Sequence, residues 1–149
     1  LLAVIRDSLT DDRYIVGESL ADVIDHEEVL LRHNELQSRV VFVATVGGKV
    51  VGWVHLDHPE REALAHTATL TVGVHREYRG HGIGEKLLER GQRWAEAVGT
   101  EKLYNTVPAT NEAAIEFLSE RGWETEAVRE NHYRIDGEYV DEVMMAYRP

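Results

Sequence analysis

Apolar and polar positions along the chain follow two periods, and these predict strands and helices in turn. Two β-branched runs, Val40–Val46 and Val50–Leu56, are joined by Gly47-Gly48 and predict a β-hairpin. In the segment His66–His75, threonines alternate with apolar residues, which predicts a strand with two distinct faces. The middle of the chain is therefore expected to form a sheet.

Helical spacing takes over after this strand. Apolar residues from Ile83 to Val98 recur at the period of a helix, and Gly99 supplies a C-cap. The elements expected after it are a strand at Lys102–Val107, a helix from Thr110 to Arg121 ended by Gly122, and strands at Thr125–Ile135 and Glu138–Tyr147 around Asp136-Gly137. Those expected at the start are a short strand at Ala3–Arg6, a helix from Thr10 to about Val23, and a helix from Asp25 through Leu36.

The strand–helix–strand unit over 67–107 implies a right-handed crossover between parallel strands, with antiparallel hairpins on either side. We expect a mixed α/β fold in a single domain over residues 1–149, because no repeat or Pro/Gly/Ser-rich linker divides the chain. There is no cysteine, which excludes disulfides, thiolate nucleophiles and a cysteine-based zinc site. No apolar run has the length of a membrane span, and Arg6 and Asp7 interrupt the opening too early for a signal peptide. The expected location is the cytoplasm.

Charge narrows the class of partner. The formal charge is −11, and no basic face for a nucleic-acid backbone is visible, so a small-molecule or peptide substrate is expected and nucleic acid is not. Only three of the sixteen basic residues are lysines, and such an acidic, lysine-poor composition suggests adaptation to high salt. Positive charge gathers locally around the segment 75–93.

That segment contains a glycine-rich turn between a strand and a helix. Glycines at 80, 82 and 84 let the backbone approach a ligand, and the amides that open the next helix favour an anion. A P-loop is excluded, because Gly84 is followed by Glu85 and Lys86 and no hydroxyl follows a lysine. A dinucleotide fingerprint fits poorly, because these glycines run G-x-G-x-G after at least three expected strands.

A third interpretation of the glycine turn fits better than the P-loop or the dinucleotide fingerprint. The run Arg79-Gly80-His81-Gly82-Ile83-Gly84, approached through Val74 and Tyr78, resembles the R/Q-x-x-G-x-G/A signature of the GCN5-related N-acetyltransferase (GNAT) superfamily. The stretch from Asn111 to Trp123 is similar to the asparagine-containing helix of the same family, and the order of elements matches over nearly the whole chain. The resemblance implies a central, largely antiparallel sheet of six to seven strands with a splayed parallel pair and about four helices.

The resemblance also implies acetyl-CoA as co-substrate, with no metal. It would lie between the splayed strands, with its pantetheine arm on the open strand edge and its pyrophosphate on the amides of the glycine turn. The residues that the family pattern assigns to it are Val72, Gly73, Val74, Arg79, Gly80, His81, Gly82, Ile83, Gly84 and Asn111. Asn111 is equally well explained as part of an ordinary helix start. Relatives often form homodimers, although no residue in this chain establishes one.

The catalytic groups depart from the family pattern. The tyrosine that protonates the leaving thiolate in many relatives is replaced by Leu118, and the positions that carry a carboxylate base hold Thr69 and Thr106. Substitutes include His55, His66, Tyr104, His132 and Tyr133, because histidine is a natural base near neutral pH and tyrosine can donate to sulfur. We take His66 and Tyr133 as the first candidates, although a surface histidine and a packed tyrosine are the commoner roles for such residues. The grouping of His55, Asp57 and His58 is interpreted as a solvated loop and not as a metal site.

Two functions follow for testing. The first is an acyltransferase that moves the acetyl group of acetyl-CoA to a primary amine of a small molecule, a protein N-terminus or a lysine. Direct attack in a ternary complex would carry the transfer. The second is an acyl-CoA-binding module with weakened or lost catalysis, suggested by Thr69, Thr106 and Leu118. A nicotinamide or flavin dinucleotide enzyme is a third, weaker alternative.

Overall fold

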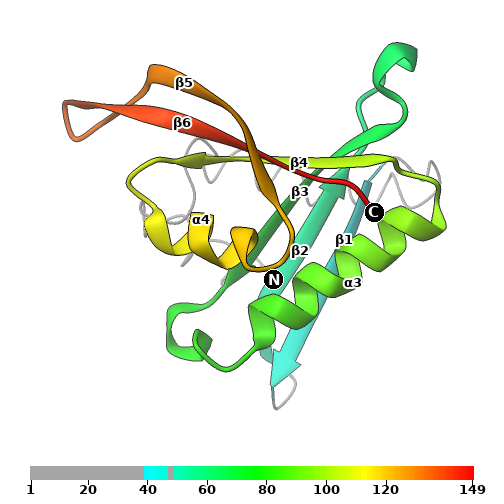
Figure 1. Ribbon diagram of the computed structural model, residues 1–149. Helices are drawn as coiled ribbons and strands as arrows, with labels where there is room; N and C mark the ends of the chain where they lie inside the picture. The colour runs from blue at the N-terminus through cyan, green and yellow to red at the C-terminus, as the bar shows by residue number, and fades with distance from the viewer. Residues whose placement is uncertain (1–38, 47–48) are drawn as a thin grey trace.

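A computed structural model describes residues 39–46 and 49–149, and Figure 1 shows their arrangement. Six strands form one sheet in the order β1-β2-β3-β4-β6-β5. The strands are β1 (Arg39–Val46), β2 (Lys49–Asp57), β3 (Thr67–Val74), β4 (Lys102–Pro108), β5 (Glu124–Ile135) and β6 (Glu138–Tyr147). The helices of the described residues are α3 (Ile83–Ala97) and α4 (Glu112–Ser119), with 3-10 turns at Glu62–Leu64 and Arg76–Tyr78.

The expected elements of this region are present. The first hairpin is the antiparallel pair β1–β2, and the last is β5–β6 around Asp136-Gly137, where both turn residues have a positive φ as a tight hairpin turn requires. The helix after β4 begins at Glu112, and its N-cap is Asn111 and not the expected Thr110; the Asn111 side chain accepts a hydrogen bond from the Ala114 amide. The predicted strand at Ala3–Arg6, the two helices expected before residue 37 and the Gly47-Gly48 connection lie outside the described residues.

Among the six described strands, only one pair of neighbours is parallel. Strands β3 and β4 run in the same direction with α3 between them in the chain, and every other neighbouring pair is antiparallel. A doubly wound dinucleotide-binding sheet is mostly parallel. The dinucleotide alternative is therefore wrong, and the mixed, largely antiparallel sheet is confirmed.

The parallel pair is short, which opens the sheet. Strands β3 and β4 are paired only from Thr67 with Lys102 to Thr69 with Tyr104. Beyond this point β3 continues to Val74 on the edge of β2, and β4 continues to Pro108 on the edge of β6. The two facing edges are thus without a ladder partner among the described residues, as the splayed pair of the sequence-based expectation requires.

Helix α3 covers one face of the sheet, with its core beneath it. A Cβ added at Gly91 of this helix would lie 3.0 Å from Leu70 and 3.1 Å from Val54, so the missing side chain allows a close approach. Val54, Leu70 and Leu88 are fully buried in the core cluster there. Helix α4 lies on the same side (Figure 1). Neither described helix is long and apolar enough to cross a membrane.

The opposite face carries a different set of side chains. Thr69 on β3 is paired in register with Tyr104 on β4, so the two side chains lie on the same face of the sheet. Strand alternation places Thr106 on this face as well. Thr106 pairs with Met144 across β4–β6, so Glu142, two residues earlier on β6, shares this face too. The sheet therefore separates an α3–α4 side from a side that carries Thr106 and Glu142.

Candidate active site

The glycine turn has the backbone geometry of a ligand cradle. Gly80 and Gly82 both have φ +77°, in the left-handed region that favours glycine, and Gly82 is the residue that precedes α3. The Arg79 Nε donates a 2.9 Å hydrogen bond to the carbonyl of Val74, which ties the turn to the end of β3. The first amides of α3 have no acceptor within the helix and point their partial positive charge out of its N-terminus.

A cleft of about 530 Å³ joins this turn to the open edge of β3 and to α4. The residues that line it are Val72, Gly73, Val74, Tyr78, Arg79, Gly80, Gly82, Gly84, Glu85, Ala113, Ala114, Phe117 and Arg121. Seven of the ten residues predicted to bind the cofactor are among them. His81, Ile83 and Asn111 are not: His81 is exposed, Ile83 packs against the core, and Asn111 is buried at the start of α4.

Gly84 lines the cleft between Val74 and Phe117. A Cβ at this position would meet Val74 at 3.6 Å and Phe117 at 3.7 Å, both ordinary contact distances. The Arg121 guanidinium lies 4.1 Å from the centre of the Phe117 ring and pairs with Glu85 at 3.4 Å. The far wall of the cleft is thus an aromatic ring capped by a cation, a feature that the sequence pattern does not single out.

Only the oxygen of the Asn111 side-chain amide has a hydrogen-bond partner within the protein. Its Oδ1 accepts a 3.2 Å hydrogen bond from the Ala114 amide and so caps α4. The residue is only 3% exposed, and its buried Nδ2 has no hydrogen-bond partner. A buried donor left in this state costs about 1–3 kcal/mol. The helix-start interpretation is confirmed, and a donor remains for a ligand.

The positions that depart from the family pattern offer no titratable group. Leu118 is 2% exposed and belongs to the core cluster, so it has no access to a leaving group. The Thr69 hydroxyl donates to the carbonyl of Asp57 at 3.4 Å. Thr106 is exposed, and its hydroxyl lies 3.5 Å from that of Tyr133.

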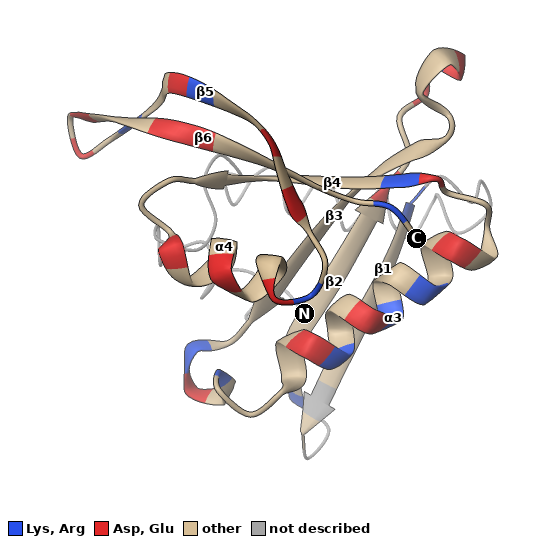
Figure 2. Ribbon diagram, viewed as in Figure 1, with Lys and Arg blue, Asp and Glu red and all other residues tan. Residues whose placement is uncertain are grey.

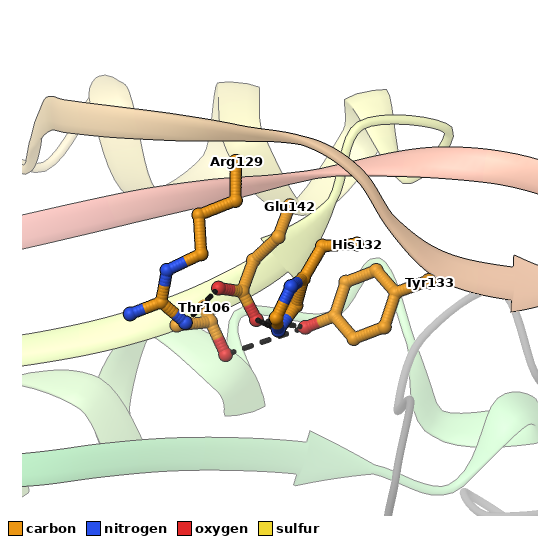
Figure 3. Close-up of polar contacts among 5 residues, drawn as sticks. All are labelled: Thr106, Arg129, His132, Tyr133 and Glu142. Atoms are coloured by element: carbon orange, nitrogen blue, oxygen red, sulfur yellow. Dashed lines mark hydrogen bonds and ion pairs between the residues drawn. The ribbon is translucent and has the colours of Figure 1, made fainter.

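Tyr133 belongs to a polar cluster that β4, β5 and β6 build together (Figure 3). Its hydroxyl donates a 2.7 Å hydrogen bond to Oε2 of Glu142. Arg129 donates to Oε1 of the same carboxylate at 2.9 Å, and Nε2 of His132 lies 3.9 Å from Oε2. The carboxylate of Glu142 is thus the centre of the cluster.

The environment of Tyr133 keeps its phenol protonated. Burial raises the pKa of Tyr133 most, and the hydrogen bond to Glu142 and its negative charge raise the pKa further. The hydrogen bond with Thr106 and the charge of Arg129 act in the opposite direction without cancelling the rise. At neutral pH Tyr133 is therefore a hydrogen-bond donor.

His66, the other catalytic candidate, lies elsewhere. It directly precedes β3, and its carbonyl accepts hydrogen bonds from the amides of Glu101 and Lys102. This is the closed end of the β3–β4 pair, while the cleft lies at the other end of β3. Its side chain is exposed and does not line the cleft. The structure brings Tyr133, but not His66, into a cluster of polar groups.

The sequence does not single out Glu142, although one signal is present. Glu142 is 4% exposed, the only acidic residue among the buried polar residues of the described chain. It directly precedes the apolar run Val143–Ala146 and follows Asp141. A buried charged residue on a strand needs partners. Those partners come from β5, and the sequence alone does not show which residues of β5 lie opposite Glu142.

The interpretation of His55, Asp57 and His58 as a solvated loop is wrong, because His55 and Asp57 belong to β2 and all three residues are half-buried. Asp57 and His58 have partners other than a metal. Asp57 forms an ion pair with Arg39 at 2.8 Å. His58 shares a 2.8 Å hydrogen bond with the hydroxyl of Thr100 and packs against Trp94. Within 39–46 and 49–149 no group of three metal-ligating side chains converges.

Comparison with known proteins agrees with this geometry. The family model "Acetyltransferase (GNAT) family" matches residues 3–123. The L-amino acid N-acetyltransferase AaaT of Escherichia coli (strain K12) is 28% identical over 108 residues, which are 70% of this chain and only 65% of that protein. Among solved structures, the ribosomal-protein-alanine N-acetyltransferase from Brucella melitensis is 26% identical with a TM-score of 0.88, covering 99% of this chain and 91% of that one.

A further solved structure has the same fold. The yncA protein from Salmonella typhimurium, solved with its cofactor acetyl-CoA, has a TM-score of 0.88 at 20% identity, covering 99% of this chain and 85% of that one. Because the family model spans most of the sequence and the solved structures have a similar fold, the chain belongs to the GNAT family of acetyltransferases.

Proposed function

We propose that this protein transfers the acetyl group of acetyl-CoA to a primary amine, by direct attack within a ternary complex. The observation that carries the proposal is the cleft, which joins an unpaired strand edge to the positive end of a helix. An extended amide-containing arm adds to an open strand edge through main-chain hydrogen bonds. A pyrophosphate is stabilised by helix N-terminal amides. Both parts of coenzyme A thus have a matching surface in one cleft.

The individual residues fit this co-substrate. The backbone of Val72–Val74 would pair with the pantetheine arm, and the amides from Arg79 to Gly84 would hold the pyrophosphate. The unpartnered Nδ2 of Asn111 supplies a donor beside the first turn of α4, whose Ala113 and Ala114 line the cleft. Acetyl-CoA then presents an activated thioester, and the protein's contribution is to hold the amine and the thioester together. Such positioning is worth roughly 7 kcal/mol or more.

The acceptor is proposed to approach from the sheet face that carries Thr106. Tyr133 lies on this side, and of the two catalytic candidates it is the one with polar partners, as a protonated phenol within hydrogen-bond reach of Thr106 and Glu142; it serves either as a proton donor itself or through the carboxylate that it holds. His66 has no such support from its position. The names of the two N-acetyltransferases reported above suggest a free amino acid or a protein N-terminal alanine as acceptor classes to test first.

One observation favours a second function. Leu118 is buried in the core and Thr69 and Thr106 cannot titrate near neutral pH, so the usual proton-transfer positions of the family are inert here. An acyl-CoA-binding module without turnover would have this pattern.

Two measurements on the purified protein separate these functions. Isothermal titration with CoA measures binding, and release of free thiol from acetyl-CoA measures turnover. The panel of acceptors is L-alanine, L-methionine, spermidine, a hexapeptide with an N-terminal alanine, and a peptide with a blocked N-terminus and a free lysine side chain. Turnover that depends on an acceptor supports the proposed enzyme. CoA binding with no turnover on any acceptor favours the module, and no CoA binding contradicts both functions.

A further inference from the structure

Glu142 is a buried carboxylate on the face of the sheet opposite α3. It pairs in register with Pro108, the last residue of β4, and lies beside the position of Thr106. Its side chain is 6% exposed. Removing a carboxylate from water is costly unless it is paired and hydrogen-bonded, so the groups that surround it carry information about its role.

Those groups hold the carboxylate without saturating it. Arg129 occupies one lone pair of Oε1 and Tyr133 occupies one of Oε2. A carboxylate has about four acceptor sites, so each oxygen can accept a further donor. The titratable or charged groups of the described chain that face it are Arg129, His132 and Tyr133, all from β5. On β4 its neighbour in the cluster is the hydroxyl of Thr106, reached through Tyr133 (Figure 3).

The β3–β4 ladder is open between the cleft and the end of β4 beside which Glu142 lies. The cleft reaches the open edge of β3 at Val72–Val74 from the α3 side. Since the ladder between the two strands ends at Thr69 and Tyr104, no backbone pairing closes the sheet between the cleft and the far end of β4. Glu142 flanks this end of β4 on the other face.

We propose that Glu142 is the catalytic base that receives the acceptor amine, an inference that rests on the proposed acetyl transfer. An acceptor ammonium donates a hydrogen bond to the Glu142 carboxylate and gives it one proton. The neutral nitrogen attacks the thioester carbon, the C–N bond forms, and the C–S bond breaks. The second nitrogen proton passes to the departing sulfur, so that amide and free thiol leave with one proton released from Glu142 to water.

Glu142 in this role supplies the carboxylate that Thr106 lacks. The family pattern expects a base at the position of Thr106, and Glu142 reaches the same neighbourhood from the adjoining strand. Arg129 and Tyr133 are positioning residues, because they hold the two oxygens of Glu142 from opposite sides.

Charge around the cluster favours a cationic acceptor. Between residues 124 and 142 the hairpin β5–β6 carries seven acidic residues against two arginines. Figure 2 shows these acidic positions spread along both strands of the hairpin. A surface of one sign raises the local concentration of an oppositely charged substrate. The acceptor class that fits is therefore an amine that is protonated in solution.

The variant Glu142→Gln tests the proposal, with Glu138→Gln on the same strand as a matched control in an exposed position. Measurements use acetyl-CoA and the best acceptor of the panel above. A general base contributes about 100-fold to 10,000-fold, so Glu142→Gln should lower kcat by at least about 100-fold. Its Kd for CoA should stay within about twofold of the wild type, and Glu138→Gln should match the wild type in both.

The pH profile separates a base from a merely structural carboxylate. Without the base only the neutral fraction of the free amine reacts, so the rate of Glu142→Gln should rise steeply between pH 7 and 9 and the gap to the wild type should narrow. A constant ratio across this range overturns the proposal. Wild-type kcat in Glu142→Gln also overturns it, as does a larger loss in His132→Asn, which would make the histidine the base.

Folding and failure of the proposed function are read separately. The shorter carboxylate in Glu142→Asp keeps the charge and should retain more activity than Glu142→Gln at equal thermal stability; equal loss in both variants contradicts a proton-transfer role. If the wild type does not turn over any acceptor, the proposed function has failed, and Glu142 as its base is overturned with it.

Discussion

The hydroxyl of Tyr133 on β5 donates a 2.7 Å hydrogen bond to the buried carboxylate of Glu142 on β6. Two strands of one hairpin thus join a phenol to an acid whose other oxygen is held by Arg129. Because a hydrogen bond across two strands orders both side chains, this contact links the stability of the hairpin with the orientation of the proposed base.

Tyr133→Phe removes this donor without changing the ring. We expect a loss of about 1 kcal/mol in the free energy of unfolding at pH 7, measured by urea denaturation. Tyr139→Phe, at an exposed tyrosine of the same hairpin, is the control and should change stability little. Equal stability of Tyr133→Phe and the wild type would show that Arg129 alone suffices to hold the carboxylate.

The same pair of proteins predicts a dependence on pH. The pKa of Tyr133 is raised in the folded protein, first by burial and then by Glu142. A raised folded pKa means that the folded state binds the phenolic proton more tightly, so its contribution to stability is complete below the unfolded pKa of about 10 and declines as pH rises through the folded value. The stability advantage of the wild type over Tyr133→Phe should therefore shrink above pH 10, and a constant difference from pH 8 to 11 would contradict the raised pKa.

Gly73 is predicted to be required by the packing of Trp53. A Cβ at Gly73 would lie 2.8 Å from both Cε2 and Nε1 of the indole, which a rigid, buried ring cannot avoid. Gly73→Ala should therefore cost about 1–3 kcal/mol in urea denaturation. The ring of phenylalanine is smaller, so Gly73→Ala should cost less in the Trp53→Phe background than in the wild type. The difference between the two costs is the coupling energy of the pair. Strict additivity of the two changes would show that the contact is not the cause.

Two substitutions of Gly84 test stability and cofactor binding separately. It lies in the first turn of α3 with room for one methyl group, so Gly84→Ala should stabilise the protein by up to about 1 kcal/mol. Gly84→Val projects two further methyl groups between Val74 and Phe117, into the cleft. We expect its Kd for CoA to rise at least about tenfold while thermal unfolding stays cooperative. Unchanged CoA affinity in Gly84→Val would place the cofactor elsewhere.

How far the sequence predicts this structure depends on how local the signal is. The bounds of β6 agree with prediction, because the residues that form the turn before it, Asp136 and Gly137, are adjacent to it in the sequence. The sequence predicts Thr110 as the N-cap of the helix after β4, but Asn111 is the N-cap and the helix begins at Glu112, because two neighbouring side chains are both able to cap and only one of them does.

The site divides in the same way. The glycine turn and the open edge of β3 follow from a continuous motif, so most of the cleft was predictable. The cluster around Glu142 was not, because Arg129 and Tyr133 meet it only through a hairpin register that shifts between those two residues. Phe117 on α4 and Arg121 just after it reach the cleft because they lie beside Gly84 and Glu85 at the start of α3, a contact between distant segments that no local pattern encodes.

The acidic composition predicts a stabilising effect of salt. With a formal charge of −11, repulsion within the folded chain should weaken as salt is added. We expect Tm to rise between about 0.05 M and 2 M KCl; a gain of about 1 kcal/mol corresponds to about 2–4 °C for a domain of this size. Sucrose of equal osmolarity is the control for general exclusion effects. A flat response to KCl would contradict adaptation to high salt.

Asn111 separates capping from ligand binding within one side chain. Its Oδ1 caps α4, and its buried Nδ2 has no partner within the protein. Asn111→Ser keeps an oxygen that can cap but removes the amide donor, whereas Asn111→Ala removes both. Serine and asparagine are similar as N-caps, and alanine costs about 1 kcal/mol. We therefore expect Asn111→Ser to remain close to the wild type in thermal unfolding and Asn111→Ala to be less stable.

Binding of CoA should follow the other half of the side chain. Both variants lack the Nδ2 donor, so both should bind CoA about tenfold more weakly in isothermal titration, a loss consistent with one buried hydrogen bond. If Asn111→Ser binds CoA as tightly as the wild type while Asn111→Ala is destabilised, the residue serves only as a helix cap, and the unpartnered amide has no role in the cleft.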